Sequence, residues 1–285
     1  MLRQRLRNAL DRLEQTRLRS VVAASASVYA SVRSRKVHAF FIDADGDWVN
    51  WQREATFVSP VRHIQDVRFV EALVHEYYSH RYVPRAGDVV VDVGAGIGEE
   101  TLIYSKLVGS SGRVIAIEAQ PRTFICLEKT VRRNGLANVT TVHSAITDCT
   151  QEVFVTDDSQ RHLWNTITSD NRAGVRVCGR TLDSVLEEVR VGRIDLLKMN
   201  IEGAEEPALA GMTGTIARTR FATIACHDFI ADAGGPGRMR TRAAVHAFLE
   251  EHGFDIVRRA QDPRPWVRDH LYGASGRPTA AGQSD

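Results

Sequence analysis

The stretch "VVVDVGAGIGEET", Val89 to Thr101, decides the fold that we predict for this chain. Its first half is an apolar, β-branched run that stops at Asp92, which is typical of a strand buried on both faces. Three glycines, Gly94, Gly96 and Gly98, then fall on alternate residues before a helical segment. A buried strand that turns tightly into a helix is the first unit of a doubly wound α/β domain, where ligands bind beyond the carboxyl ends of the strands.

Strands and helices continue to alternate along the chain. The apolar runs "RVIAIE", "IDLLKM", "FATIAC" and "FDIVRR" are separated by helical stretches, and an antiparallel excursion over residues 152–180 interrupts them. This order predicts a mostly parallel seven-stranded sheet with helices on both faces. We expect a basic amphipathic helical segment at 1–36, a β-hairpin decoration at 37–67, the α/β domain at 68–272 and a mobile tail at 273–285.

The composition is that of an ordinary globular protein, with 285 residues, 43% hydrophobic and 25% charged. Charge is distributed unevenly, because residues 1–36 hold nine Arg or Lys and two acids, which leaves 28 basic and 33 acidic residues elsewhere. The mildly acidic body disfavours a nucleic-acid partner. The four cysteines form no C-x-x-C pair, so neither a zinc cluster nor a disulfide framework is expected, and we predict a cytoplasmic protein.

The N-terminal segment combines leucines and arginines. Leu2, Leu6, Leu10 and Leu13 recur at helical spacing among arginines, which predicts a basic amphipathic helix over about the first twenty residues. Such a helix could dock on its own domain, pack on a second copy in a homodimer, or make a peripheral contact with an acidic membrane surface. The uncharged run at 20–32 is too short and too rich in serine for a transmembrane segment.

The predicted hairpin contains acids at calcium-loop spacing. Asp43, Asp45, Asp47 and Glu54 occupy positions 1, 3, 5 and 12 of such a loop. Trp48 stands at position 6, however, where the calcium loop requires glycine, and the flanking segments read as strands. Calcium binding is therefore disfavoured.

The glycine spacing identifies a cofactor class. G-x-G-x-G is one residue tighter than the dinucleotide G-x-G-x-x-G, which disfavours a nicotinamide-dependent oxidoreductase. Asp92 suits an ammonium group, and Glu118, which ends the next strand, can accept both ribose hydroxyls. A ligand with a ribose, an ammonium group and no phosphate is S-adenosylmethionine. The predicted cofactor-binding residues are Asp92, Gly94, Ala95, Gly96, Gly98, Thr101, Glu118, Ala119, Ser144, Ala145 and Asn200.

The segment "IDLLKMNIEGAE", with "GDVVVDVGAGIG", "VIAIEAQP" and "TLDSVL", resembles the FkbM family of S-adenosylmethionine-dependent, class I methyltransferases. The resemblance runs from about Tyr82 to Val257. It implies an O-methyltransferase that acts on a hydroxyl of a sugar, a glycolipid or a secondary metabolite. The chain departs from the family pattern at Gly96, where Asn is more usual, and at Asn200, where the family carries Asp.

Polar residues that follow two neighbouring strands are the catalytic candidates. Glu202 follows "IDLLKMN", and His227 and Asp228 follow "FATIAC", so we expect all three in one crevice. His227 is the predicted general base. Asn200, Glu202 and Asp228 could instead hold a divalent cation, although the neutral side chain of Asn200 is a weaker ligand for it than a carboxylate. Glu202 could equally be a carboxylate that caps the following helix. A non-catalytic cofactor-binding scaffold remains an alternative.

The acceptor is expected to be a small molecule or a glycan, held by three decorations of the fold. These are the hairpin with Trp48 and Trp51, the insert with His162 and Trp164, and the glycine-rich "DAGGPGRMR". Aromatic faces suit sugar rings, and glycines can hinge a lid.

Overall fold

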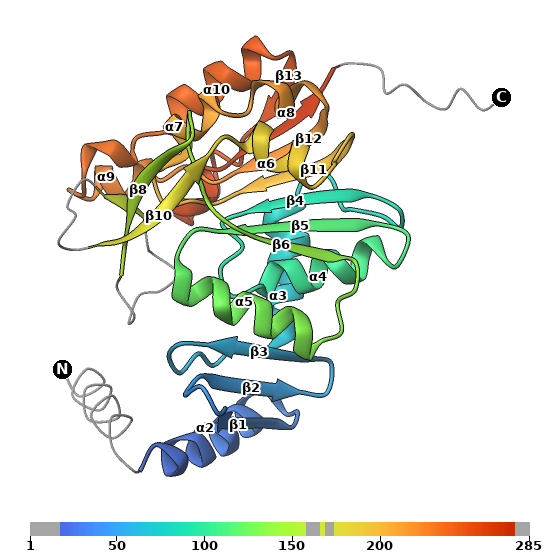
Figure 1. The fold of residues 1–285 in the computed structure, drawn as a ribbon, viewed down its shortest axis with the longest axis vertical. Helices are drawn as coiled ribbons and strands as arrows, with labels where there is room; N and C mark the ends of the chain where they lie inside the picture. Colours follow the sequence, from blue (N-terminus) through green and yellow to red (C-terminus); the bar gives the residue numbers. More distant parts are fainter. Residues whose placement is uncertain (1–17, 158–165, 169–173, 277–285) are drawn as a thin grey trace.

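The computed structural model describes residues 18–157, 166–168 and 174–276, and its centre is a seven-stranded sheet (Figure 1). The strand order is β13-β14-β12-β11-β4-β5-β6, and every neighbouring pair is parallel except those that involve β14. This confirms the predicted doubly wound sheet. Its strands are β4 (Val89–Val93), β5 (Arg113–Glu118), β6 (Val139–His143), β11 (Ile194–Met199), β12 (Thr219–Ile224), β13 (Phe254–Val257) and β14 (Leu271–Ser275).

The strand order reverses between β4 and β11. From β4 the chain builds outward through β5 and β6, and it then returns to place β11 on the other side of β4. The carboxyl ends of β4 and β11 therefore lie side by side, and the segments that leave them diverge. Open α/β sheets bind their ligands in the crevice formed at such a switch point.

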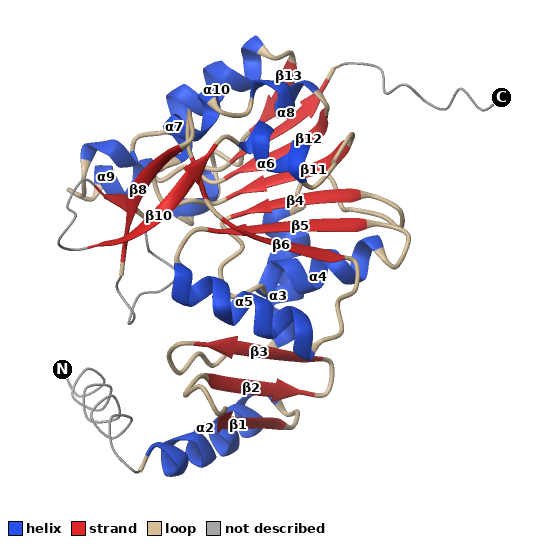
Figure 2. Ribbon diagram, viewed as in Figure 1, coloured by secondary structure: helices blue, strands red, loops and turns tan. Residues whose placement is uncertain are grey.

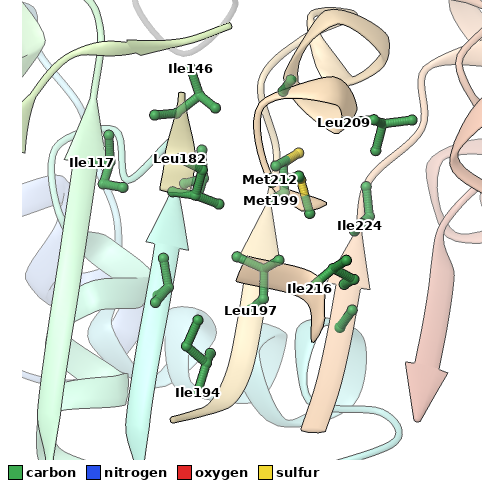
Figure 3. Packing of buried hydrophobic residues seen from close by; sticks show 14 of the residues in the cluster. Ile117, Ile146, Leu182, Ile194, Leu197, Met199, Leu209, Met212, Ile216 and Ile224 are labelled. Carbon is green, nitrogen blue, oxygen red and sulfur yellow. The ribbon is translucent and has the colours of Figure 1, made fainter. Parts of the chain in front are cut away.

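Helices cover both faces of the sheet (Figure 2). Strand residues such as Leu197, Met199 and Ile224 pack against Leu209 and other helical side chains in one buried cluster (Figure 3). The helices of this face are α6 (Leu182–Glu188), α7 (Glu205–Ala210), α8 (Thr213–Ala217) and α10 (Arg242–Glu251). A second cluster on the other face involves α3 (Val67–Leu73), the π-helix η1 (Val74–Tyr78), α4 (Glu99–Val108), α5 (Pro121–Arg133) and α11 (Pro265–Arg268).

An N-terminal unit of one helix and a small antiparallel sheet docks on α5 (Figure 1). The backbone amide of Val58 donates to Thr130 Oγ1 at 3.0 Å, and that of Thr56 donates to Asn134 Oδ1 at 2.8 Å. The predicted hairpin is thus present with a third strand added. The unit comprises α2 (Arg19–Ser34), β1 (His38–Ile42), β2 (Trp48–Gln52) and β3 (Ala55–Ser59). Most of the helix predicted over the first twenty residues lies outside the described residues.

The aspartates at calcium-loop spacing surround an ammonium group. Asp43, Asp45 and Asp47 each lie within 2.9 Å of Lys129 Nζ, and Arg122 pairs with Asp47 as well. The side chain of Lys129 is buried, so these ion pairs tie the turn between β1 and β2 to α5. A cationic side chain neutralises the cluster that a metal ion would otherwise neutralise.

The predicted excursion forms a second sheet, in which β8 (Gln151–Thr156) pairs antiparallel with β10 (Gly174–Arg180). The shorter strands β7 (Ala145–Ile146) and β9 (Ile167–Thr168) complete it, and α9 (Asp228–Asp232) and η3 (Gly237–Met239) follow β12. The predicted tail begins too early, because residues 273–275 belong to β14 in the central sheet. Among the described residues, no helix has the length and apolarity needed to cross a bilayer.

Candidate functional site

The glycine turn after β4 adopts a backbone that only glycine accepts without strain. Gly94, Gly96 and Gly98 have φ values of 75°, 56° and 91°. A Cβ atom on Gly94 would lie 2.0 Å from the backbone oxygen of Asn200, which begins the turn after β11. The two loops at the switch point are therefore in direct backbone contact, and glycine makes this approach possible.

Glu118 ends β5 with its carboxylate held against the turn. Its Oε2 accepts a hydrogen bond from the Gly96 amide at 2.9 Å, and its Oε1 accepts one from the Gln120 amide at 2.8 Å. Burial raises the pKa of Glu118 to about 7, although these amide hydrogen bonds oppose the shift. Each carboxylate oxygen has a second lone pair, so the group can still accept hydrogen bonds from a ligand.

A cavity of about 270 Å³ opens above this turn. Asp92, Gly98 and Thr101 do not line it, whereas every other predicted cofactor-binding residue does. These lining residues are Gly94, Ala95, Gly96, Glu118, Ala119, Ser144, Ala145 and Asn200.

The position of Asp92 corrects one prediction. Its carboxylate is fully buried beneath the turn, where it accepts a hydrogen bond from Thr101 Oγ1 at 2.7 Å and lies 2.8 Å from Lys198 Nζ. Asp92 is thus not available as the partner of a ligand's ammonium group. Lys198, on β11, also donates to the Gly94 carbonyl at 2.9 Å. Burial opposes the charge of Lys198, but Asp92 and Glu100 raise its pKa, so the ammonium supports the turn from below.

The walls of the cavity carry more negative than positive side chains. Glu99, Glu100, Glu118 and Glu202 line it, with Lys198 as the basic lining residue. Burial raises the pKa of Glu100 to about 7, which Lys198 opposes. A cavity of this charge favours a cationic ligand and disfavours the pyrophosphate of a dinucleotide. The residues therefore fit S-adenosylmethionine, which carries a sulfonium, an ammonium group and a ribose.

A second cavity, of about 350 Å³, adjoins the first. Its lining is largely aromatic, and it combines the predicted Asn200, Glu202 and His227 with aromatic residues that the sequence analysis did not assign to the site. Tyr78, Asn200 and Glu202 line both cavities and form their common wall. The remaining lining residues are Tyr77, Ala225, Cys226, His227, Phe229 and Trp266.

Tyr77 and Tyr78 owe their placement to the π-helix η1. Short π-helical turns often mark functional sites, and this one sets two consecutive tyrosines into the same cavity. The hydroxyl of Tyr77 donates to the Trp266 carbonyl at 3.1 Å and lies 2.8 Å from His270 Nδ1. His270 is fully buried, and burial holds its pKa well below the ordinary value, so this wall is fixed by a neutral network.

Glu202 is a non-glycine residue in the left-handed region, with φ 54°. Its side chain lines both cavities and lies 3.3 Å from His227 Nε2. Such a backbone costs about 1 kcal/mol and often marks a functional position. The first turn of α7 contains Glu205 instead, whose Oε1 accepts hydrogen bonds from the amides of Ile201 and Gly203 in the preceding turn, each at 3.3 Å.

His227 lies between two carboxylates. Its Nε2 is 3.3 Å from Glu202 and its Nδ1 is 3.1 Å from Glu205. Burial lowers its pKa, but the contacts with these two acids outweigh it and raise the pKa to about 10. At neutral pH the ring is an imidazolium, which has no lone pair to accept a proton. His227 is therefore the positive partner of Glu202, and an imidazolium does not fit the predicted role of general base.

Asp228 does not join the predicted crevice. Its Oδ2 accepts hydrogen bonds from the amides of Thr241 and Arg242, at 3.1 and 2.9 Å, and so caps α10. The oxygen set Asn200, Glu202 and Asp228 is consequently not assembled around one point, and these residues do not fit a divalent cation. Within the described residues, Asn200 Oδ1 is buried without a hydrogen-bond partner, and Asn200 lines both cavities.

Of the three predicted acceptor decorations, the hairpin and the glycine-rich segment line neither cavity. Trp48 is buried in the N-terminal unit, and neither it nor Trp51 lines a cavity described above. His162 and Trp164 lie outside the described residues. In the glycine-rich segment, Met239 contacts Gly203, where a Cβ atom would lie 2.5 Å from its sulfur.

Comparison with solved structures gives distant likenesses. An FkbM methyltransferase from Methylobacillus flagellatus KT is 18% identical with a TM-score of 0.49, and the match covers 71% of this chain and 50% of that protein. The chain therefore spans half of that protein's length. Fibrillarin from Aeropyrum pernix, in complex with natively bound S-adenosyl-L-methionine, is 14% identical over 82% and 96% of the two chains, with a TM-score of 0.42. Cofactor-bound Rv0187 from MTB is 14% identical over 94% and 96%, with a TM-score of 0.46.

No curated protein matches the chain. The model of the methyltransferase FkbM domain, in contrast, matches residues 92–256, which is more than half of the sequence. This span begins at Asp92 in β4 and includes the glycine turn, Glu118, Asn200 and Glu202. The chain therefore belongs to the FkbM family of S-adenosylmethionine-dependent methyltransferases.

Proposed function

We propose that the protein transfers a methyl group from S-adenosylmethionine to a hydroxyl group of a sugar, a glycolipid or a secondary metabolite. The observation that carries the proposal is the wall of Tyr78, Asn200 and Glu202 that two cavities share. An acidic cavity that suits a cationic cofactor lies on one side, and an aromatic cavity lies on the other. A methyl donor and an acceptor bound in this way would meet at Glu202.

On the cofactor side, Glu118 would accept hydrogen bonds from the ribose hydroxyls, and Glu100 would face the ammonium group. The amides of the turn keep Glu118 oriented, and Lys198 keeps the turn in place. The cofactor supplies an electrophilic methyl group on a sulfonium centre. The chain must then align the acceptor oxygen and remove its proton.

On the acceptor side, Trp266, Phe229 and Tyr77 offer flat apolar faces to a ring such as that of a sugar. Glu202 would take the proton of the attacking hydroxyl. His227, as an imidazolium, would hold the Glu202 carboxylate in place.

A glycine substitution tests the role of Glu202 without straining the turn. Because φ at position 202 is 54°, Glu202→Gly removes the strain of a left-handed backbone. This gain offsets part of the stability lost with the contact to His227, so the variant should fold. We expect methyl transfer to fall by roughly 10²- to 10⁴-fold, the usual effect of removing a general base. Arg190→Gly is the matched control, since Arg190 is exposed and has φ 56°.

The assay incubates each variant with radiolabelled S-adenosylmethionine and a panel of free sugars, glycosides and polyhydroxylated metabolites. S-adenosylhomocysteine binding is measured beside it by calorimetry. Loss of transfer with intact binding in Glu202→Gly, and neither effect in Arg190→Gly, supports the proposal. Equal transfer rates in Glu202→Gly and the parent protein would contradict it.

A further inference from the structure

The outer face of α2 is apolar and exposed. The inner face of this helix, with Val22, Ala23, Ala26 and Ala30, is buried in a cluster with Phe40 and Trp48. The outer face carries large apolar side chains in a row. Their exposed fractions are 49% for Leu18, just before the helix, then 59% for Val21, 66% for Val28, 54% for Tyr29 and 74% for Val32. We call these five residues the α2 stripe.

The stripe is unusual for a helix at the surface of a protein. The outer face of such a helix normally carries polar and charged residues, whereas the residues between Val21 and Val32 include no charged side chain. Figure 1 shows α2 at the end of the molecule, beyond the small sheet and away from the α/β core. A contiguous exposed apolar patch at such a place marks a binding surface.

The charges around the stripe are positive. Helix α2 contains no acidic residue, and exposed Arg33 and Arg35 lie at its C-terminal end. Two acids near this end are already paired, since Glu54 lies 2.8 Å from Lys36 and Asp66 lies 2.7 Å from Arg68, which donates to the Ser34 carbonyl. The preceding seventeen residues add five arginines and two acids.

These charges discriminate between occupants of the stripe. A second copy of the chain would bring its own arginines against Arg33 and Arg35. The chain's N-terminal segment, if it folded back, would do the same with its five arginines. A surface of anionic phospholipids would pair with the arginines while its acyl boundary receives the apolar side chains. Charge complementarity therefore selects a lipid surface over both protein occupants.

We propose that α2 lies flat on a membrane that contains anionic phospholipids. The α2 stripe enters the boundary between headgroups and acyl chains, and Arg33 and Arg35 contact lipid phosphates. Residues 19–34 are too few to span a bilayer, in agreement with the absence of a spanning helix among the described residues. The helix therefore rests on the surface.

Vesicle flotation of the full chain tests the proposal. The probes are vesicles of phosphatidylcholine alone and of phosphatidylcholine with phosphatidylglycerol at about 3:1. We expect at least about tenfold tighter binding to the anionic vesicles, weakened by salt. Val28→Ser with Val32→Ser should lower that binding by about tenfold or more, because two side chains that insert into the lipid lose their apolar atoms. Both positions face solvent, so the fold should be kept.

Two further variants complete the design. Val83→Ser with Val257→Ser, at exposed valines outside the stripe, is the matched control and should bind as the parent does. Arg33→Gln with Arg35→Asn tests the charge, and each lost arginine should weaken binding about fivefold. Asn is chosen at position 35 because Arg35 has φ 57°, which Asn tolerates.

Several outcomes would overturn the proposal. One is equal binding to neutral and anionic vesicles, and another is no binding to either. A dimer in sedimentation analysis that Val28→Ser with Val32→Ser dissociates would assign the stripe to a second copy. A Tm lowered by several degrees in that variant without vesicles would show that the stripe is already covered in the free protein.

Discussion

Replacement of His227 by Gln should destabilise the protein at neutral pH and much less at high pH. The ring is 5% exposed and lies between Glu202 and Glu205. Burial lowers its pKa, but these acids raise it to about 10, against 6.5 for an ordinary histidine. The folded state therefore holds the proton more tightly than the unfolded state does. This stabilisation is fully present below pH 6.5 and is lost as the pH rises through 10.

The magnitude follows from the two pKa values. Their difference, from 6.5 to about 10, corresponds to on the order of 5 kcal/mol at about 1.4 kcal/mol for each pH unit. We expect the parent protein to exceed His227→Gln by several kcal/mol in free energy of unfolding at pH 6.5. The gap should narrow steadily as the pH approaches 10.

Urea unfolding followed by circular dichroism, at pH 6.5, 8 and 10, measures the gap. His246→Gln is the control, because His246 is exposed and its contact with Glu250 is 3.8 Å long. That variant should show a change below about 1 kcal/mol at every pH. A gap for His227→Gln that stays constant or widens between pH 6.5 and 10 would refute the assignment of an ion-paired imidazolium.

Three other predictions concern the cofactor cavity. Gly94→Ala should weaken S-adenosylhomocysteine binding by at least about tenfold in calorimetry, because the new Cβ atom would lie 2.0 Å from the Asn200 backbone oxygen and φ is 75°. Gly192→Ala is the control and should bind as the parent does, because a Cβ atom at Gly192 meets open space. Because Glu118 and Glu100 have pKa values of about 7, and S-adenosylhomocysteine favours their ionised forms, its affinity should fall by up to about fivefold for each carboxyl group as the pH drops from 7 to 6; a Kd independent of pH would contradict this. Lys198→Met leaves Asp92 buried without its cation, so thermal denaturation should show a loss of about 3–5 kcal/mol, against about 0–1 kcal/mol for exposed Lys36→Met.

Local patterns predicted the parts of the site that are contiguous in sequence. The strand, the glycine turn and the helix between Val89 and Thr101 are coded by neighbouring residues, and the next strand places Glu118 at the same edge of the sheet. The α/β fold followed from the same alternation of apolar strands and helices. These features depend on hydrophobic period and turn chemistry, which a sequence displays directly.

Features that depend on register or on distant segments were missed. Asp92 and Lys198 are direct partners across β4 and β11, so their ion pair appears only when the two strands are aligned. A lysine within the apolar run "IDLLKM" was the available signal, since a buried lysine needs an anionic partner. The second cavity joins Tyr77 to Trp266, which are 189 residues apart.

Strand β14 shows a different limit of sequence patterns. Gly273, Ala274 and Ser275 are small residues with little apolar surface, so they resemble a tail. They form a strand because β12 and β13 present free edges on both sides of them. Only the assembled sheet supplies that reason.

The central claim is that Glu118 holds the ribose of a phosphate-free, cationic nucleoside above the glycine turn. Calorimetric titration of Glu118→Ala with S-adenosylhomocysteine tests it most directly, with exposed Glu152→Ala as the control. Two hydrogen bonds to a charged carboxylate contribute roughly 1.5–3 kcal/mol each, so we predict a Kd more than about 100-fold weaker for Glu118→Ala and unchanged for the control. A Kd for Glu118→Ala within about threefold of the parent value would contradict the account.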